Sequence, residues 1–105
     1  MDLTEIKVFP VDEHRLKAYV TVTLDNCFVI RDLKIINGNN GLFVAMPNKK
    51  RKDGVYRDIA HPLNNETREL FENKIINAYE TELKTNPQKK VSKEQAEAAQ
   101  DNHAV

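Results

Sequence analysis

The chain has 105 residues, 40% of them hydrophobic and 30% charged, which fits one globular domain and leaves no room for a second core. Its 16 basic and 16 acidic residues cancel, which argues against a protein that holds DNA by net charge alone, and its longest apolar run, Leu42 to Met46, is far too short for a membrane span. Asp2 and Glu5 stand where a signal peptide would need basic and apolar residues, and Cys27 is alone, so we expect a cytoplasmic protein with no disulfide or cysteine metal cluster.

The first 60 residues have the two-residue hydrophobic period of β-strands, interrupted by turn residues. Ile6 and Val8 alternate with charged neighbours, and a longer alternating stretch covers residues 18–24. Asp25-Asn26 suits a tight hairpin because both side chains tolerate positive φ. Three more strands follow, separated by an Asn- and Gly-rich turn and by Asp53-Gly54: residues 27–36, 42–46 and 55–60. The pattern therefore predicts five strands joined largely by hairpins.

A helical period replaces the strand period after residue 62. Asn64 or Asn65 can cap the helix, and Asn86-Pro87 ends it because the residue before a proline avoids helical angles. One face of this helix is apolar and is assigned to the core: Phe71, Ile75, Ala78, Tyr79 and Leu83. Strands and helix together predict one α+β domain over residues 1–84.

Residues 85–105 form a polar tail with almost no large apolar side chain. Such a segment cannot bury much surface. We therefore expect the tail to be a short, frayed helix or disordered.

The third and fourth predicted strands carry apolar residues on both faces. One helix covers only one face of a sheet, so the other face or an open edge needs a partner surface. A homodimer is the simplest solution, because closed two-fold assemblies are the commonest oligomers.

Lys49-Lys50-Arg51-Lys52 is the main functional signal, four consecutive cations at the tip of a predicted hairpin. These side chains repel one another and do not help the fold. They would suit phosphate contacts, and a two-stranded ribbon is narrow enough for a major groove. The alternative is a solvated loop whose lysines block aggregation. The run by itself favours neither interpretation, and duplication in a dimer would favour binding.

A second polar cluster follows this hairpin. Arg57 and Asp58 are neighbours on a strand, so their side chains face opposite sides. His61 can contact phosphate or a base, or act as a general base with Asp58, but a hydrogen-bonded residue at a strand end is the favoured interpretation. Arg68, one turn into the helix, either binds phosphate or only pairs with Glu72 at the i, i+4 spacing.

Residue sets for catalysis or metal binding are missing from the sequence. Besides His61 there are two histidines, one in a turn and one in the tail, and the single serine is also in the tail. Cys27 lies beside Phe28 in a predicted strand, where a buried, inert thiol is the default. We therefore expect no catalytic residue, no metal site, no cofactor and no enzymatic activity.

Three blocks of sequence strongly resemble the stage V sporulation protein G family: Leu24 to Ile30, Asn39 to Pro47 and Tyr56 to Asn64. The resemblance runs in order from Met1 to Leu83, and its Gly41-to-Pro47 and Arg57-to-Pro62 motifs are highly specific together. It implies a compact α+β dimer in which a curved antiparallel sheet precedes the main helix, and the pattern above gives that sheet five strands. The tail from Lys84 onward has no counterpart in this resemblance.

Family members are described as regulators of cell septation and sporulation and as site-specific DNA- and RNA-binding proteins. The resemblance places the family's basic stretch on Lys49, Lys50 and Arg51, and its two arginines on Arg57 and Arg68. With Lys52, these residues are the predicted nucleic-acid-binding set. The run of Lys49, Lys50, Arg51 and Lys52 would hold phosphates. The guanidinium forks of Arg57 and Arg68 suit bidentate contacts to base edges. The alternative function is a protein-interaction module that acts in septation control without direct nucleic-acid binding.

Overall fold

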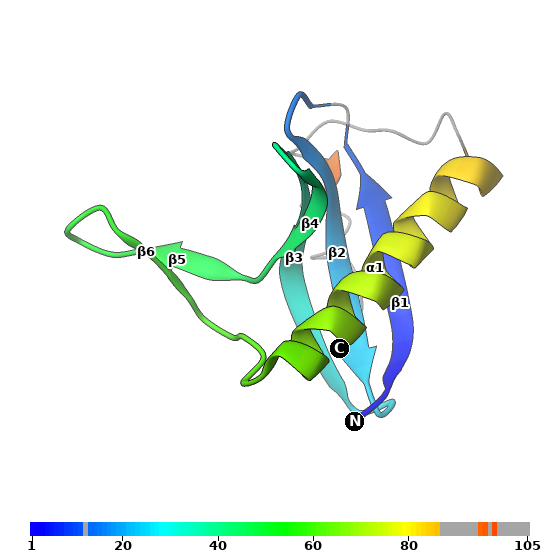
Figure 1. Cartoon of the computed structure of the whole chain (residues 1–105), viewed down its shortest axis with the longest axis horizontal. Coiled ribbons are helices and arrows are strands. Elements are labelled where there is room, and N and C mark those ends of the chain that lie inside the picture. The colour runs from blue at the N-terminus through cyan, green and yellow to red at the C-terminus, as the bar shows by residue number, and fades with distance from the viewer. Residues whose placement is uncertain (12, 87–94, 97, 99–105) are drawn as a thin grey trace.

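Four strands form one antiparallel sheet in the order β1-β2-β3-β4, and a single long helix follows (Figure 1). The computed structural model describes residues 1–11, 13–86, 95–96 and 98. The sheet strands are β1 Leu3–Pro10, β2 Leu16–Leu24, β3 Phe28–Gly38 and β4 Gly41–Ala45. The predicted α+β class, an antiparallel sheet followed by one main helix, is confirmed.

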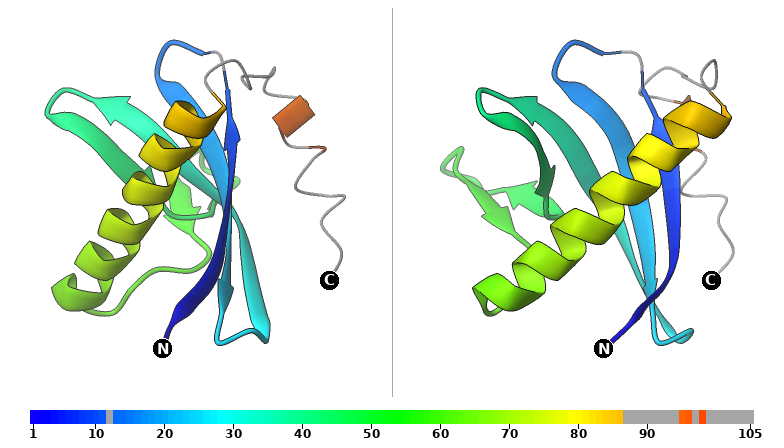
Figure 2. Two further views of the ribbon diagram at one scale, coloured as in Figure 1. Left: turned by 90° about the vertical axis from the view of Figure 1, so that its right-hand side faces the viewer. Right: turned by 45° about the vertical axis from the view of Figure 1, so that its right-hand side comes forward.

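Apolar side chains from neighbouring strands form the inward face of the sheet. Val8 on β1, Val20 on β2 and Leu33 on β3 lie side by side in register and are all buried. The pairing register shifts between Leu16 and Ala18 and between Val20 and Val22, irregularities that increase the local twist. The sheet accordingly curves around the helix (Figure 2).

Helix α1, Asn65–Thr85, covers this inward face and contacts β1 and β4. Asn64 is its N-cap, with the Asn64 Oδ1 accepting a hydrogen bond from the Thr67 backbone N–H at 2.8 Å, and Asn86 is its C-cap. Its predicted apolar face packs on the sheet, with three side chains buried and the others partly buried: Phe71, Ile75, Tyr79, then Ala78 and Leu83. Among the described residues, no helix is both long and apolar enough to cross a membrane.

The predicted fifth strand does not join the main sheet. Tyr56–Asp58 (β6) pairs instead with Asn48–Lys50 (β5) in a separate two-stranded ribbon. Pro47, which cannot donate a ladder hydrogen bond, lies with Met46 in the two-residue link between β4 and β5. Its carbonyl accepts a hydrogen bond from the Ile59 N–H at 2.7 Å, which closes the base of the ribbon. The ribbon therefore projects away from the body of the protein (Figure 1).

The outward face of the sheet is partly covered. Tyr19 and Val11 are buried there, and Ala96 packs against them with no exposed surface. Gln95, Ala96 and Ala98 are helical. The rest of the tail prediction falls on residues 87–94, 97 and 99–105, which lie outside the described residues.

Candidate nucleic-acid interface

The ribbon places two cations directly opposite each other. Lys49 on β5 pairs with Arg57 on β6, and Lys50 pairs with Tyr56. Residues directly opposite in an antiparallel pair share a face, and like charges in that position destabilise the pairing. Lys49 and Arg57 therefore weaken the pairing of the ribbon strands that carry them.

A tight turn joins the two strands and holds the other cations. The Arg51 N–H donates to the Val55 carbonyl at 2.8 Å, and the Gly54 N–H donates to the Arg51 carbonyl at 3.0 Å. Gly54 has a φ of 88°, a conformation that favours glycine. Asp53 stabilises the turn by accepting a hydrogen bond from the Val55 N–H at 3.0 Å. The predicted Asp53-Gly54 turn thus presents Arg51 and Lys52 at the tip.

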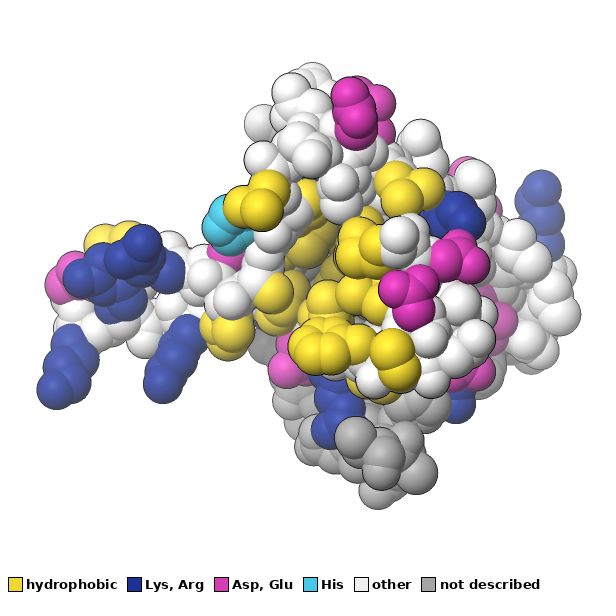
Figure 3. Space-filling model, turned by 90° about the horizontal axis from the view of Figure 1, so that it is seen from below, with side chains coloured by type: hydrophobic (Ala, Val, Ile, Leu, Met, Phe, Trp, Pro, Cys, Tyr) yellow, Lys and Arg dark blue, Asp and Glu magenta, His cyan; other side chains and the backbone are white. Residues whose placement is uncertain are grey.

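Counter-charge on the ribbon is sparse. Arg51 lies 3.8 Å from Asp53, and both side chains are about half exposed. Within the described part of the chain, no carboxylate lies within ion-pair distance of four exposed cations: Lys49, Lys50, Lys52 and Arg57. Basic side chains gather on the projecting ribbon (Figure 3), and they line an open groove along it. The ribbon is an open positive surface.

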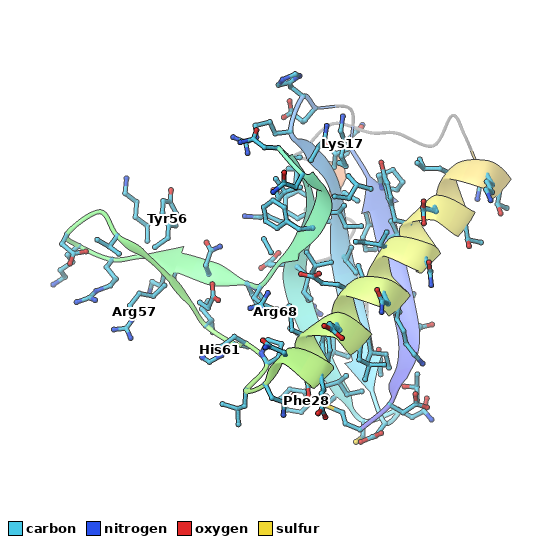
Figure 4. The ribbon with its side chains drawn as sticks, in the orientation of Figure 1. Lys17, Phe28, Tyr56, Arg57, His61 and Arg68 are labelled. Atoms are coloured by element: carbon cyan, nitrogen blue, oxygen red, sulfur yellow. The ribbon has the colours of Figure 1, made fainter. Side chains whose placement is uncertain are left out.

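Arg68 is held by a different element. It lies in the second turn of α1, where the capped helix start fixes the backbone, and Figure 4 shows it apart from Arg57 on the ribbon. Its guanidinium is 3.9 Å from the Glu72 carboxylate, the i, i+4 pair expected from the sequence. With 42% of its side chain exposed, this pair is a weak surface interaction that leaves Arg68 accessible. The structure therefore groups five of the six predicted residues and sets Arg68 apart.

His61 lies exposed on the segment that returns from the ribbon to the helix (Figure 4). Its Nδ1 is 3.0 Å from the carbonyl oxygen of Pro62. Within the described ranges, no group of three or more His, Cys, Asp or Glu side chains is placed to hold a metal ion.

The expectation of a buried Cys27 is wrong. Asp25 and Asn26 have positive φ values of 50° and 57°, and the Cys27 N–H donates to the Leu24 carbonyl at 3.0 Å. Cys27 is therefore the last residue of a tight turn of the mirror-image type common in hairpins, not a strand residue. Its thiol is exposed because the turn lies beyond the end of the sheet.

Sequence reasoning missed an apolar pocket of about 140 Å³ beside the base of the ribbon. Its walls come from the chain start, the ends of the sheet strands, the segment after the ribbon and the first turns of α1, so no local pattern marks it. The lining residues are Met1, Leu24, Ile30, Met46, Pro47, Ala60, His61, Pro62, Thr67 and Phe71.

A family model and several known proteins are similar to this chain over most of its length. Residues 1–81 match the family model SpoVG. A protein of Bdellovibrio bacteriovorus is 71% identical over 85 residues, which cover 81% of this chain and 79% of the relative. A protein of Anaeromyxobacter sp. (strain K) is 66% identical over 84 residues, covering 80% and 83%, and one of Caldicellulosiruptor bescii is 49% identical over 81 residues, covering 76% and 92%. All three bear the name "Putative septation protein SpoVG".

Proposed function

We propose that this chain, which belongs to the SpoVG family and has a septation-related role, is a homodimeric regulator that binds DNA or RNA. The ribbon of β5 and β6 is the main contact surface, and the start of α1 is the second. The proposal places the protein in the cytoplasm and gives it no catalytic step and no cofactor.

The placement of Lys49 opposite Arg57 carries this proposal. A fold gains nothing from two like charges on one face of a two-stranded ribbon. Phosphate groups would remove the repulsion, because each cation then gains a partner of opposite charge. The same two-stranded shape fits a major groove, which admits a β-ribbon as well as a helix.

The cations have different chemical roles in this proposal. The ammonium groups of Lys49, Lys50 and Lys52 hold phosphates, which position the protein without reading sequence. The guanidinium of Arg57 can form the bidentate contact that distinguishes a base edge. Arg68 adds a contact from the helix and would exchange its weak pairing with Glu72 for one with the nucleic acid.

Homodimer formation is supported by apolar surface as well as by charge. Phe28, Phe43 and Leu63 are exposed large hydrophobic side chains at separate places on the protein, and contact with a second copy would bury some of them. Two-fold symmetry also doubles the ribbon cations, which strengthens binding to a polyanion.

Titration of the native protein against labelled duplex DNA and single-stranded RNA, at a low and a high salt concentration, tests the proposal. Binding that weakens steeply with salt is expected, because each neutralised phosphate releases condensed counterions. Undetectable or salt-insensitive binding to both nucleic acids would reject the proposed contact.

The second candidate is a protein-interaction module in septation control that does not touch nucleic acid. The zero net charge of the chain favours it, as do the acidic residues that outnumber the basic ones on α1. The same titration separates the two, because only direct nucleic-acid binding gives the strong salt response.

A further inference from the structure

Tyr56 is an exposed aromatic residue on the ribbon that carries the cations. It belongs to β6, lies directly opposite Lys50 of β5 and is 64% exposed. Within the part of the chain that the structure describes, its side chain makes no hydrogen bond and no ring contact. A single exposed apolar side chain on a neutral surface needs no explanation. Tyr56, in contrast, shares its ribbon with cations that attract a polyanion.

The two faces of the ribbon carry different side chains. Neighbouring residues of a strand point to opposite faces, and residues directly opposite each other on two strands share a face. Tyr56 and Lys50 therefore lie on one face, and Arg57 and Lys49 lie on the other. Figure 4 shows Tyr56 and Arg57 on opposite sides of the ribbon. One face presents two cations, whereas the other presents an aromatic ring beside a cation.

The strand pairing brings the side chains of Lys50 and Tyr56 close to each other. In the next pair toward the tip, the Arg51 N–H donates a hydrogen bond to the Val55 carbonyl. Hydrogen-bonded and non-hydrogen-bonded pairs alternate along an antiparallel ribbon, and side chains lie closer in the second type. Lys50 and Tyr56 form a pair of this second type. The ribbon backbone thus sets a flat ring next to a flexible cation.

We propose that the Tyr56 face of the ribbon binds single-stranded nucleic acid, with an unpaired base stacked on the Tyr56 ring and the adjoining phosphate held by Lys50. This inference rests on the proposed function and names the form of nucleic acid that this face binds. Aromatic rings stack on bases of any sequence, and neighbouring cations follow the backbone. In an intact duplex the neighbouring base pairs cover each base face, so the Tyr56 ring has no stacking partner there.

Asp58 limits where phosphates can lie on this face. With Asn48 it forms the next pair on the same face, at the end of the ribbon nearer the main sheet. A carboxylate repels phosphate, whereas Lys52 lies in the turn at the tip. The phosphates of the bound strand therefore lie toward the tip, on the side of Lys50 and Lys52.

Intrinsic tyrosine fluorescence is a direct reporter of this stacking. The chain has three tyrosines and no tryptophan, and Tyr19 and Tyr79 are only 2% and 5% exposed. Tyr56 is therefore the tyrosine that a nucleic acid can reach. A single-stranded oligonucleotide of mixed sequence should quench part of the emission of the native protein, because a stacked base quenches the ring. The matched duplex should quench far less.

Fluorescence anisotropy with short labelled strands of RNA and DNA measures what the ring contributes to affinity. Loss of one stacked base weakens binding by about 5- to 150-fold, which is the loss expected for Tyr56→Leu. Tyr56→Phe is the matched control, because it keeps the ring, and it should bind as the native protein does. The expected loss on either type of strand supports the inference, and the larger loss identifies the preferred strand.

The salt dependence separates stacking from damage to the ribbon. Neither variant removes a charge, so the slope of log affinity against log salt should keep its native value in both. Unfolding of the ribbon in Tyr56→Leu would instead scatter the cations and make the slope shallower, and the loss of affinity would then not be due to stacking.

Four results would overturn the inference. Native affinity of Tyr56→Leu for single strands, with the native salt slope, rejects stacking and leaves the ribbon as a phosphate-binding surface. An equal loss of affinity for the matched duplex rejects the preference for unpaired bases. A Tyr56→Leu protein that sediments as a monomer where the native protein is a dimer would assign the ring to the contact between subunits. Absence of binding by the native protein to any nucleic acid rejects the proposed function as well.

Discussion

Replacing Lys49, Lys50 and Lys52 with alanine should change the salt dependence of nucleic-acid binding more than any other property. The three lysines have no carboxylate within ion-pair distance in the described part of the chain, so they are free to hold phosphates. The proposed homodimer would lose six cations, three from each copy. Each phosphate contact on duplex DNA contributes about −0.9 to the slope of log affinity against log salt, so the slope should become shallower by about 5. Over a rise from about 50 to 200 mM salt, these contacts account for roughly a thousandfold of affinity.

Fluorescence anisotropy of a labelled duplex at several salt concentrations measures this slope. The matched control is alanine at Arg15, Lys74 and Lys84, which removes the same charge from exposed positions outside the ribbon. The control should keep the native slope, and its exposed Lys74–Asp2 pair, with 3.7 Å between charged atoms, contributes little to stability. An unchanged slope in the ribbon variant, or an equal change in the control, would refute phosphate binding by the ribbon.

Three further predictions concern the helix and the core. Asn64→Ala removes the cap bond to Thr67 and should lower the thermal midpoint by about 4–8 °C, whereas Asn64→Asp should retain it, as thermal circular dichroism would show. Ile75→Ala leaves a cavity at a fully buried site and should lower the free energy of unfolding, measured with urea, by about 2–5 kcal/mol. A smaller loss would mean that neighbouring core residues move into the cavity. Burial raises the pKa of Tyr79 above its ordinary 10.0, so the stability linked to its protonated form is complete below pH 10 and is lost as the pH rises through the raised pKa. Tyr79→Phe should therefore lose less unfolding free energy above pH 10 than the native protein, and equal losses would contradict the assignment.

Turn and helix-cap conformations could be predicted from the sequence. Asp25 and Asn26 were expected to tolerate positive φ, and both adopt it. Asn64 caps α1, and Asn86, the residue before a proline, ends it. Each of these predictions depends on a side chain acting on backbone within a few residues, so sequence order was sufficient.

Only part of the candidate nucleic-acid interface could be predicted from the sequence. The sequence shows the run of four cations and Arg57, but it does not show that Lys49 lies opposite Arg57. That pairing depends on the register of the two ribbon strands. The exposure of Cys27 depends on the exact residue at which β3 begins. Strand boundaries are the least reliable part of a sequence interpretation, and a shift of one residue changes which side chains are buried.

The α+β class, the family, the helix limits and the turn conformations could all be predicted from the order of the residues, because alternation, capping and turn propensity act over short distances. Two features could not be predicted in this way: the last two strands leave the sheet as a separate ribbon, and distant segments enclose an apolar pocket. The physical reason is that strand pairing and pocket formation join residues far apart in the chain, and their free energy depends on which surfaces meet rather than on neighbours in sequence.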